Sequence, residues 1–189
     1  MTAHSTDLKT LLKDPSLLET RAFVAGEWVD ADDGKTFPVR NPARGDVIAE
    51  VADLSRAEVR RAIEAAHAAM KGWQAKTAKE RAQVMRKWFD LMMANQEDLA
   101  QIMTAEQGKP LAEARNEIAY AASFVEWFAE EGRRVAGETI ATNDPAKRLL
   151  VLRQPVPISS PQLEIFRRFH PMNARPPQPA GDRLIKESS

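Results

Sequence analysis

Proline is distributed very unevenly along the 189-residue chain. Seven of the 12 prolines lie in the last 35 residues, which leaves five for the first 154. Because proline lacks a backbone N–H and fixes φ, so dense a cluster cannot sustain a long helix or an interior strand. We therefore expect a folded part that ends near residue 156, followed by a Pro-rich tail at 157–189 that is disordered or loosely attached.

The sequence at the beginning of the folded part predicts a short leader followed by β-strands. Residues 1–20 are expected to form a short amphipathic leader that Pro15 interrupts. A glycine at the centre of the β-prone run 23–29 is typical of a tight hairpin, and the sequence at 41–46 indicates a further turn. The pattern predicts one small antiparallel meander over 21–52.

Two Ser/Thr-x-x-Glu sequences mark the starts of helices. Ser55 with Glu58, and Thr77 with Glu80, fit the capping box, in which a hydroxyl and a carboxylate satisfy backbone N–H groups of the first turn. The first helix is expected to run to about Met70.

The second helix is expected to run from Thr77 to 107 and to end at Gly108, which can adopt the left-handed conformation of a helix C-terminus. Pro110 suits the first turn of a third helix, which should end at Gly132 or Gly137. The apolar faces of the three helices are predicted at Val59, Ile63, Ala66 and Met70; at Met85, Trp88, Met92, Leu99 and Ile102; and at Leu111, Ala114, Ile118, Ala121, Val125 and Phe128.

The third helix carries a second apolar line, made by Tyr120, Phe124 and Trp127 at spacings of four and three. One interpretation is that these aromatic residues belong to the core or to a domain interface. The other is that they form a wall of a substrate channel. Beyond this helix, the run 147–154 predicts a single strand that Pro155 ends.

Composition excludes several functional classes. The charges balance, with 27 Lys+Arg against 27 Asp+Glu, so no overall attraction for nucleic acid or an anionic membrane is expected. The chain has no cysteine, which excludes disulfides, thiolate metal sites and a cysteine nucleophile within it. Neither a signal peptide nor a membrane-length apolar run is evident, and a soluble cytoplasmic protein is expected.

A search for catalytic motifs finds no glycine-rich dinucleotide turn, no phosphate loop and no nucleophile elbow. His4, His67 and His170 fall in separate segments, so no metal site is expected. The charged residues at 126–134 are interpreted as a solvated face with local ion pairs. Lys109 lies in a helix-turn-helix junction and has no independent reason to be catalytic.

Five blocks nevertheless carry a family resemblance: GEW at 26–28, NPARG at 41–45, AKERA at 78–82, EQGKPLAEA at 106–114 and FVEWFAEE at 124–131. In this order, they resemble the opening of the aldehyde dehydrogenase superfamily. The last two blocks are most similar to succinate-semialdehyde dehydrogenases. The resemblance begins near residue 20 and stops at Pro155 or Val156.

The resemblance implies an α/β family fold of which this chain is an incomplete piece. It would hold the N-terminal β-meander, three helices and one further strand, and would lack most of the Rossmann-like parallel sheet. Residues 21–137 would form the N-terminal part of the NAD(P)-binding domain, with its helices at 55–137. Residues 146–156 would form a strand of the oligomerisation region.

The resemblance also implies oxidation of an aldehyde to an acid with NADP or NAD. In this chemistry a cysteine thiolate attacks the aldehyde, a glutamate activates water, and an asparagine of a Trp-Asn-Phe-Pro motif stabilises the oxyanion. None of the three has a counterpart here, and Asn173 lacks the flanking residues to be that asparagine. The chain is therefore expected to bind no cofactor and to be catalytically incompetent, whereas Phe124 and Trp127 would line the aldehyde pocket of an intact relative.

Two origins remain open for the loss of resemblance after 156. A frameshift or misjoined reading frame would leave an N-terminal fragment of a succinate-semialdehyde dehydrogenase. Alternatively, the chain is a non-catalytic helical module that associates with full-length aldehyde dehydrogenase subunits. In either case, helices without the sheet that they normally cover should leave apolar faces exposed, giving marginal stability and self-association.

Overall fold

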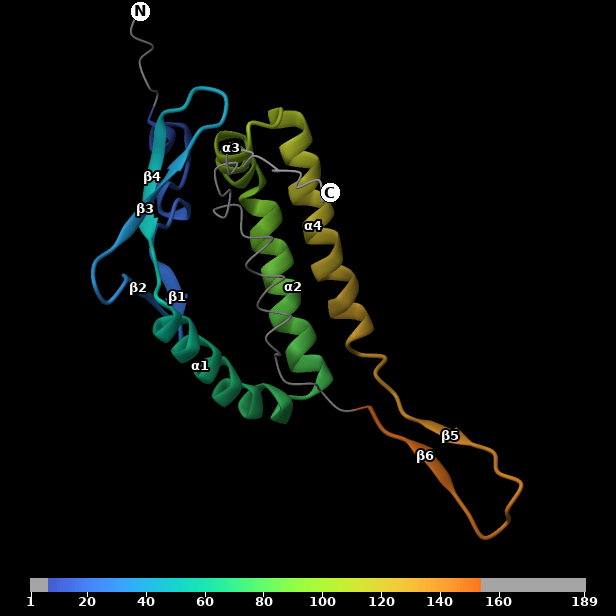
Figure 1. The fold of residues 1–189 in the computed structure, drawn as a ribbon. Helices are drawn as coiled ribbons and strands as arrows, with labels where there is room; N and C mark the ends of the chain where they lie inside the picture. Colours follow the sequence, from blue (N-terminus) through green and yellow to red (C-terminus); the bar gives the residue numbers. More distant parts are fainter. Residues whose placement is uncertain (1–6, 154–189) are drawn as a thin grey trace, which may run out of the picture.

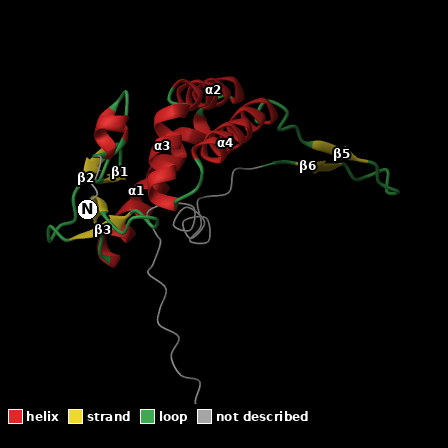
Figure 2. Cartoon of the chain, turned by 90° about the horizontal axis from the view of Figure 1, so that it is seen from above, coloured by secondary structure: helices red, strands yellow, loops and turns green. Residues whose placement is uncertain are grey.

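The computed structural model of the chain describes residues 7–153. Within this range two hairpins lead into four helices, and a third hairpin projects away from the helices (Figure 1 and Figure 2). The tail at 157–189, together with His4 and His170, lies outside the described residues.

The first hairpin joins β1 (Ala22–Val24) to β2 (Glu27–Val29) and confirms the predicted glycine-centred turn. Ala25 and Gly26, with φ of 54° and 93°, both occupy the left-handed region that a two-residue hairpin turn requires. Phe23 lies opposite Trp28, with ring centroids 4.9 Å apart.

The second hairpin pairs β3 (Thr36–Arg40) with β4 (Val47–Ala52), and the predicted turn between them is present. Buried Asn41 holds this turn, because its Oδ1 accepts hydrogen bonds from the backbone N–H groups of Ala43 and Arg44.

The single meander predicted for 21–52 is wrong, because the two hairpins form separate two-stranded sheets. The segment between them is anchored elsewhere. The N–H of Asp32 donates to Oε1 of buried Glu58 at 2.7 Å, and the Asp32 carboxylate pairs with Arg61 at 2.7 Å. These contacts attach the connection to the beginning of the first helix rather than to a neighbouring strand.

The leader packs onto the body of the structure through two short 3₁₀ turns, Leu8–Leu11 and Pro15–Leu17. The two turns are separated at residues 12–14, just before Pro15, and Leu11 of the first turn is exposed. Three of the leader's leucines are buried and contact β4 and the helix α3 (Gln96–Gln107): Leu8, Leu12 and Leu18, packed against Ile48, Ile102 and Ala105.

Asp98 fixes the leader by hydrogen bonding. Its buried carboxylate accepts from the N–H groups of Lys13 at 3.0 Å and Asp14 at 2.9 Å. Because each oxygen receives one donor, the carboxylate satisfies two backbone groups that lie between the 3₁₀ turns.

The helices start as predicted but are four rather than three. Both capping boxes are formed, at Ser55 before α1 (Arg56–Ala75) and at Thr77 before α2 (Ala78–Ala94). The first helix continues past Met70, and among its residues only Glu58 is buried, so its predicted apolar face is only partly covered.

The long second helix predicted from Thr77 to 107 is interrupted at Asn95, after which α3 runs over Gln96–Gln107. The Asn95 side chain donates to the carbonyl of Leu91 at 2.9 Å, and such side-chain competition for backbone partners favours a helix end. Acidic residues in the first turn of α3 complement its dipole.

Gly108 ends α3 with φ of 73°, as predicted, and α4 (Leu111–Glu131) follows Pro110. Of the two predicted ends for this helix, Gly132 is the one observed. A Cβ at Gly108 would lie 2.9 Å from Cγ of Pro42, so the position requires glycine for both conformation and space.

Small residues bring α3 and α4 together. Ala100, Ala114 and Ile118 are buried between them, and Leu99, Met103 and Leu111 pack around this cluster. The predicted apolar face of α4 is partly wrong, because Ala122 and Ala129 are buried instead of Ala121, and Phe128 is exposed. Trp88, assigned to the packed stripe of α2, is also exposed.

The third hairpin pairs β5 (Glu138–Ile140) with β6 (Leu149–Val151), and all six strand residues are exposed. Only the second of these strands was predicted, because Thr139 and its neighbours carry little apolar pattern. Among residues 7–153, none of the helices combines the length and apolar character needed to cross a bilayer.

We predict that Asp98→Ala releases the leader. Loss of two charge-assisted hydrogen bonds should cost roughly 2 kcal/mol, so local opening should rise about 30-fold. Trypsin cleavage after Lys9 and Lys13 in the native chain measures this opening. Glu64→Ala, which removes an exposed carboxylate from α1, is the matched control. An unchanged cleavage rate in the Asp98 variant would contradict this role.

Candidate functional site

The two predicted channel residues, Phe124 and Trp127, lie on the outer side of α4. The buried positions of the helix recur at Ala114, Ile118 and Ala122, so the aromatic line falls on the opposite side. Tyr120, Phe124 and Trp127 are 66%, 47% and 64% exposed, and the Tyr120 and Phe124 rings meet edge to face at 4.8 Å. Within the described residues they are therefore not core, which leaves the interface and channel interpretations.

Ion pairs fix α4 against its neighbours. Glu126 accepts from Arg86 of α2 at 2.6 Å. Arg115 donates two hydrogen bonds to Glu97 of α3, at 2.6 and 2.8 Å. These contacts hold the helix in one orientation relative to α2 and α3, so the direction in which Phe124 and Trp127 point is set by the fold.

Lys109 also belongs to this set of ion pairs. Its Nζ lies 2.5 Å from Oε2 of Glu117, one turn and a half into α4. The pair closes the junction between α3 and α4, which agrees with the interpretation of Lys109 as a junction residue. The local ion pairs predicted at 126–134 are present in part, since Arg134 pairs with Glu131.

A buried carboxylate lies at the end of α3. Glu106 is 6% exposed, and its Oε2 has no hydrogen-bond partner among the described residues. Burial raises the pKa of Glu106 to about 7, because desolvation penalises the charged form. The Thr104 hydroxyl, two residues earlier, is likewise without a partner among residues 7–153.

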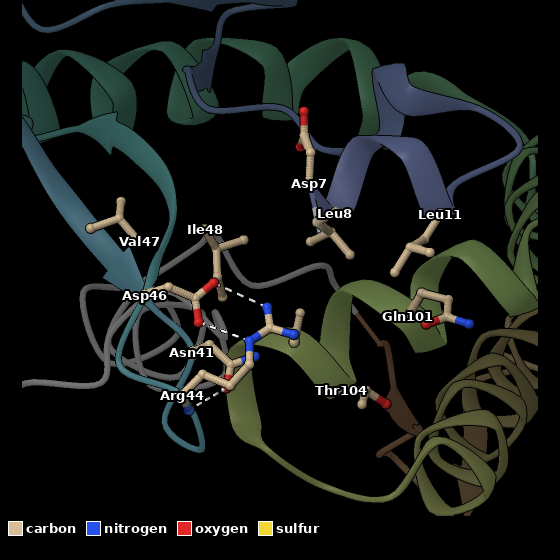
Figure 3. A pocket seen from close by; sticks show the side chains of 11 residues that line it. Asp7, Leu8, Leu11, Asn41, Arg44, Asp46, Val47, Ile48, Gln101 and Thr104 are labelled. Carbon is tan, nitrogen blue, oxygen red and sulfur yellow. Dashed lines mark hydrogen bonds and ion pairs between the residues drawn. The ribbon is translucent and has the colours of Figure 1, made fainter. Parts of the chain in front are cut away.

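A cavity of about 310 Å³ lies between the leader, the 41–46 turn and α3 (Figure 3). Arg44 lies at its wall, with its guanidinium held by Asp46 at 2.9 and 3.0 Å. The lining is otherwise aliphatic or neutral: Leu8, Leu11, Asn41, Val47, Ile48, Gln101, Thr104 and Ala105, with Asp7 at the rim. Its walls contain no cysteine, histidine or lysine, and the aromatic line of α4 takes no part in it.

The described residues lack the parallel-strand arrangement that usually binds a nicotinamide dinucleotide. Pyrophosphate is usually bound by free N–H groups at a helix N-terminus that follows a parallel strand. Here all strand pairs of residues 7–153 are antiparallel. The first turns of α1 and α2 are already occupied by the carboxylates of Glu58 and Glu80, which would repel a phosphate. The hydrogen bonds from Ser55 and Asp32 also keep the pKa of Glu58 below its ordinary value.

The family follows from a sequence comparison. The sequence profile described as "Aldehyde dehydrogenase family" matches residues 28–160, which is most of the chain. The chain belongs to the aldehyde dehydrogenase family. The match reaches four residues beyond Val156, where the resemblance was expected to stop.

Curated relatives agree with this assignment and refine it. The chain is 56% identical over 149 residues to the glutarate-semialdehyde dehydrogenase of Pseudomonas putida. It is 52% identical over 149 residues to the NADP(+) succinate-semialdehyde dehydrogenase of Escherichia coli. Both alignments cover 79% of this chain but 31% of the relative, so the chain spans less than a third of the length of these enzymes.

Solved structures show the same relationship. The succinate-semialdehyde dehydrogenase of Burkholderia pseudomallei matches with a TM-score of 0.74 and 59% identity, over 76% of this chain and 30% of that one. An aldehyde dehydrogenase of Brucella melitensis gives the same TM-score at 60% identity. The described fold is thus an α/β fragment of four helices and small antiparallel strand pairs that matches the N-terminal part of the family fold.

Sequence reasoning missed two buried carboxylates, Asp98 and Glu106. Both lie on α3, where charged residues would ordinarily be assigned to the exposed face of the helix. Their spacing of eight residues, with Ile102 and Ala105 between them on the packed side, is the one signal that could have placed them against the leader and β4.

We predict that Glu106 makes the chain less stable as pH rises. Its pKa is raised on folding, so the unfolded state ionises first, and stability is lost from about pH 5 upward until the folded group ionises near 7. Relative to Glu106→Gln, the wild-type chain should lose roughly 2 to 3 kcal/mol of unfolding free energy between about pH 5 and about pH 8.

Urea unfolding followed by tryptophan fluorescence measures this difference. Glu113→Gln, at an exposed carboxylate of α4, serves as the control and should give a constant offset across the same pH range. Parallel pH profiles for wild type and Glu106→Gln would show that Glu106 is ionised in both states.

Proposed function

We propose that this chain supplies the N-terminal third of a semialdehyde dehydrogenase that oxidises a short aldehyde carrying a distal carboxylate, such as succinate or glutarate semialdehyde. The observation that carries the proposal is the identity of 52–56% over 149 residues to two bacterial enzymes with these substrates in their names. As part of the proposal, NADP is the preferred cofactor of the whole enzyme, which the name of the Escherichia coli relative supports.

Within this proposal the chain alone is catalytically inactive. Thioester formation needs a cysteine thiolate, and the sequence contains no cysteine. The strand pairs of residues 7–153 are all antiparallel, so the parallel strand that usually precedes a pyrophosphate-binding helix is absent from this range. Residues 21–137 would then form the N-terminal part of the NAD(P)-binding domain, and the exposed β5–β6 hairpin would contribute to subunit assembly.

Phe124 and Trp127 are proposed to contact the carbon chain of the aldehyde in the whole enzyme. Their rings are accessible, and α4 packs against α3 through small buried residues and is joined to α2 and α3 by ion pairs. Apolar contact would hold the short methylene chain, while other segments would bind its carboxylate.

The first prediction of this proposal concerns activity. The purified 189-residue chain, supplied with succinate or glutarate semialdehyde and either NADP+ or NAD+, should form no reduced nicotinamide above the blank. The full-length Escherichia coli relative provides the positive control in the same assay. Turnover by the chain alone would contradict the proposal that the chain is catalytically inactive without the rest of the enzyme.

The second prediction concerns the aromatic wall. In the Pseudomonas putida relative, alanine at the positions aligned with Phe124 and Trp127 should raise KM for the aldehyde roughly tenfold and leave kcat nearly unchanged, because uniform binding is lost. Alanine at the position aligned with Trp28, an exposed aromatic residue of the first hairpin, is the control. If the α4 variants keep the wild-type KM, these residues belong to an interface instead.

A further inference from the structure

We propose that the cavity between the leader and α3 binds a small uncharged molecule that has an aliphatic chain and one hydroxyl or carbonyl oxygen. The volume of the cavity is about 310 Å³. Sites for small molecules begin at roughly 300 Å³, and at the roughly 30 Å³ that a water molecule occupies in the liquid, this space corresponds to about ten non-hydrogen atoms. The proposed function makes no use of this part of the chain, so the inference is independent of it.

The aliphatic lining of the cavity comes from three segments. Leu8 and Leu11 of the leader lie on one side of it (Figure 3). Ile48 of β4 and Ala105 of α3 contribute the rest of this lining. Leu11 is 51% exposed although it lines the cavity, so the leader leaves apolar surface that a bound aliphatic chain would remove from water.

One nitrogen of Arg44 supplies the cavity with a hydrogen-bond donor. Both hydrogen bonds of this side chain within residues 7–153 go to Asp46, from Nε and Nη2 at 2.9 and 3.0 Å. Because the guanidinium group is planar, its third nitrogen, Nη1, points away from Asp46, and Figure 3 shows this nitrogen on the side of α3. A hydroxyl or carbonyl oxygen of a bound molecule can accept a hydrogen bond from Nη1.

The charges around the cavity favour a molecule without a charge of its own. Asp46 neutralises Arg44 and raises the pKa of its guanidinium, so the ion pair persists at neutral pH. Asp7 adds a second carboxylate at the rim. A carboxylate ligand would compete with Asp46 for one cation and approach another negative group, whereas an ammonium group would face the Nη1 donor. A neutral oxygen avoids both conflicts.

The Thr104 hydroxyl is an independent sign that the cavity takes an occupant. Thr104 lines the cavity from α3, and its buried Oγ1 has no hydrogen-bond partner among the described residues. Buried hydroxyl groups are nearly always hydrogen-bonded, to protein, water or a ligand. Because threonine has two common rotamers in a helix, the hydroxyl can turn toward an oxygen in the cavity.

Binding in the cavity should also hold the leader closed. Leu8 and Leu11 belong both to the first 3₁₀ turn and to the cavity wall, so the complete site exists only while the leader is packed against α3. A ligand that binds one of two states stabilises that state according to its concentration relative to Kd. At ten times Kd, local opening of the leader should therefore fall about elevenfold.

Titration of the purified 189-residue chain with 1-hexanol tests the inference. The backbone amide NMR signals of Leu11, Ile48 and Gln101 should shift in a saturable way, which gives Kd. Trypsin cleavage after Lys9 and Lys13 should slow about elevenfold at ten times that Kd. Hexanoate and hexylammonium, which have the same chain length and opposite charges, should bind at least fivefold more weakly.

The chain contains its own control for general solvent effects. Lys147 and Arg148 precede β6 in the exposed third hairpin, so trypsin cleavage after them should not change when 1-hexanol is added.

Substitutions locate the binding site. Leu11→Trp should fill the cavity and weaken 1-hexanol binding at least tenfold, whereas Leu149→Trp, at an exposed residue of β6, should leave Kd unchanged. Arg44→Met removes the donor but keeps an unbranched side chain, and it should weaken binding about fivefold. Circular dichroism checks that the variants keep their helices, and if one does not, the charge series on the wild-type chain decides.

Several results would overturn the inference. These are amide shifts that do not saturate, equal protection of the leader and of the third hairpin, or an unchanged Kd in a folded Leu11→Trp variant. Hexanoate binding as tightly as 1-hexanol would contradict an uncharged ligand, and an unchanged Kd in Arg44→Met would contradict the role of Nη1. None of these measurements depends on turnover, so the proposed activity can fail without affecting them.

Discussion

Ala100 and Ala114 have no exposed surface, and their contact sets the arrangement of the helices. A methyl side chain on each helix lets α3 and α4 approach closely, and Ile118 fills the space one turn further along. Ion pairs from Glu97 and Arg86 then fix the rotation of α4. The outward direction of the aromatic residues is thus a result of where the small residues lie.

The local features of the fold could be predicted because each depends on a few adjacent residues. Both capping boxes, the glycine-centred hairpin and the helix end at Gly108 formed as expected. The break at Asn95 could not be predicted in this way. The Asn95 side chain donates a hydrogen bond to the Leu91 carbonyl at the break, whereas the apolar periodicity continues through it. The segment between the two sheets is likewise held by a hydrogen bond from the N–H of Asp32 to Glu58. The two residues are distant in sequence, so no local pattern predicts this contact.

The candidate site was less accessible to sequence reasoning for a related reason. Spacing placed Phe124 and Trp127 on one line of α4 and could not say which line is buried. In the structure, Ala122 and Ala129 occupy the buried line of α4, and the larger Phe128, which was expected there, is exposed. Among the described residues the helices therefore bury alanine and expose tryptophan, so much of their aromatic surface is directed outward.

The contact between Gly108 and Pro42 joins two of the sequence blocks that identify the family. The residues lie far apart along the chain, yet neither position can change its size without pressing on the other. Substitutions at these two sites should therefore be non-additive, and a change tolerated in one relative should fail in another that differs at the partner position.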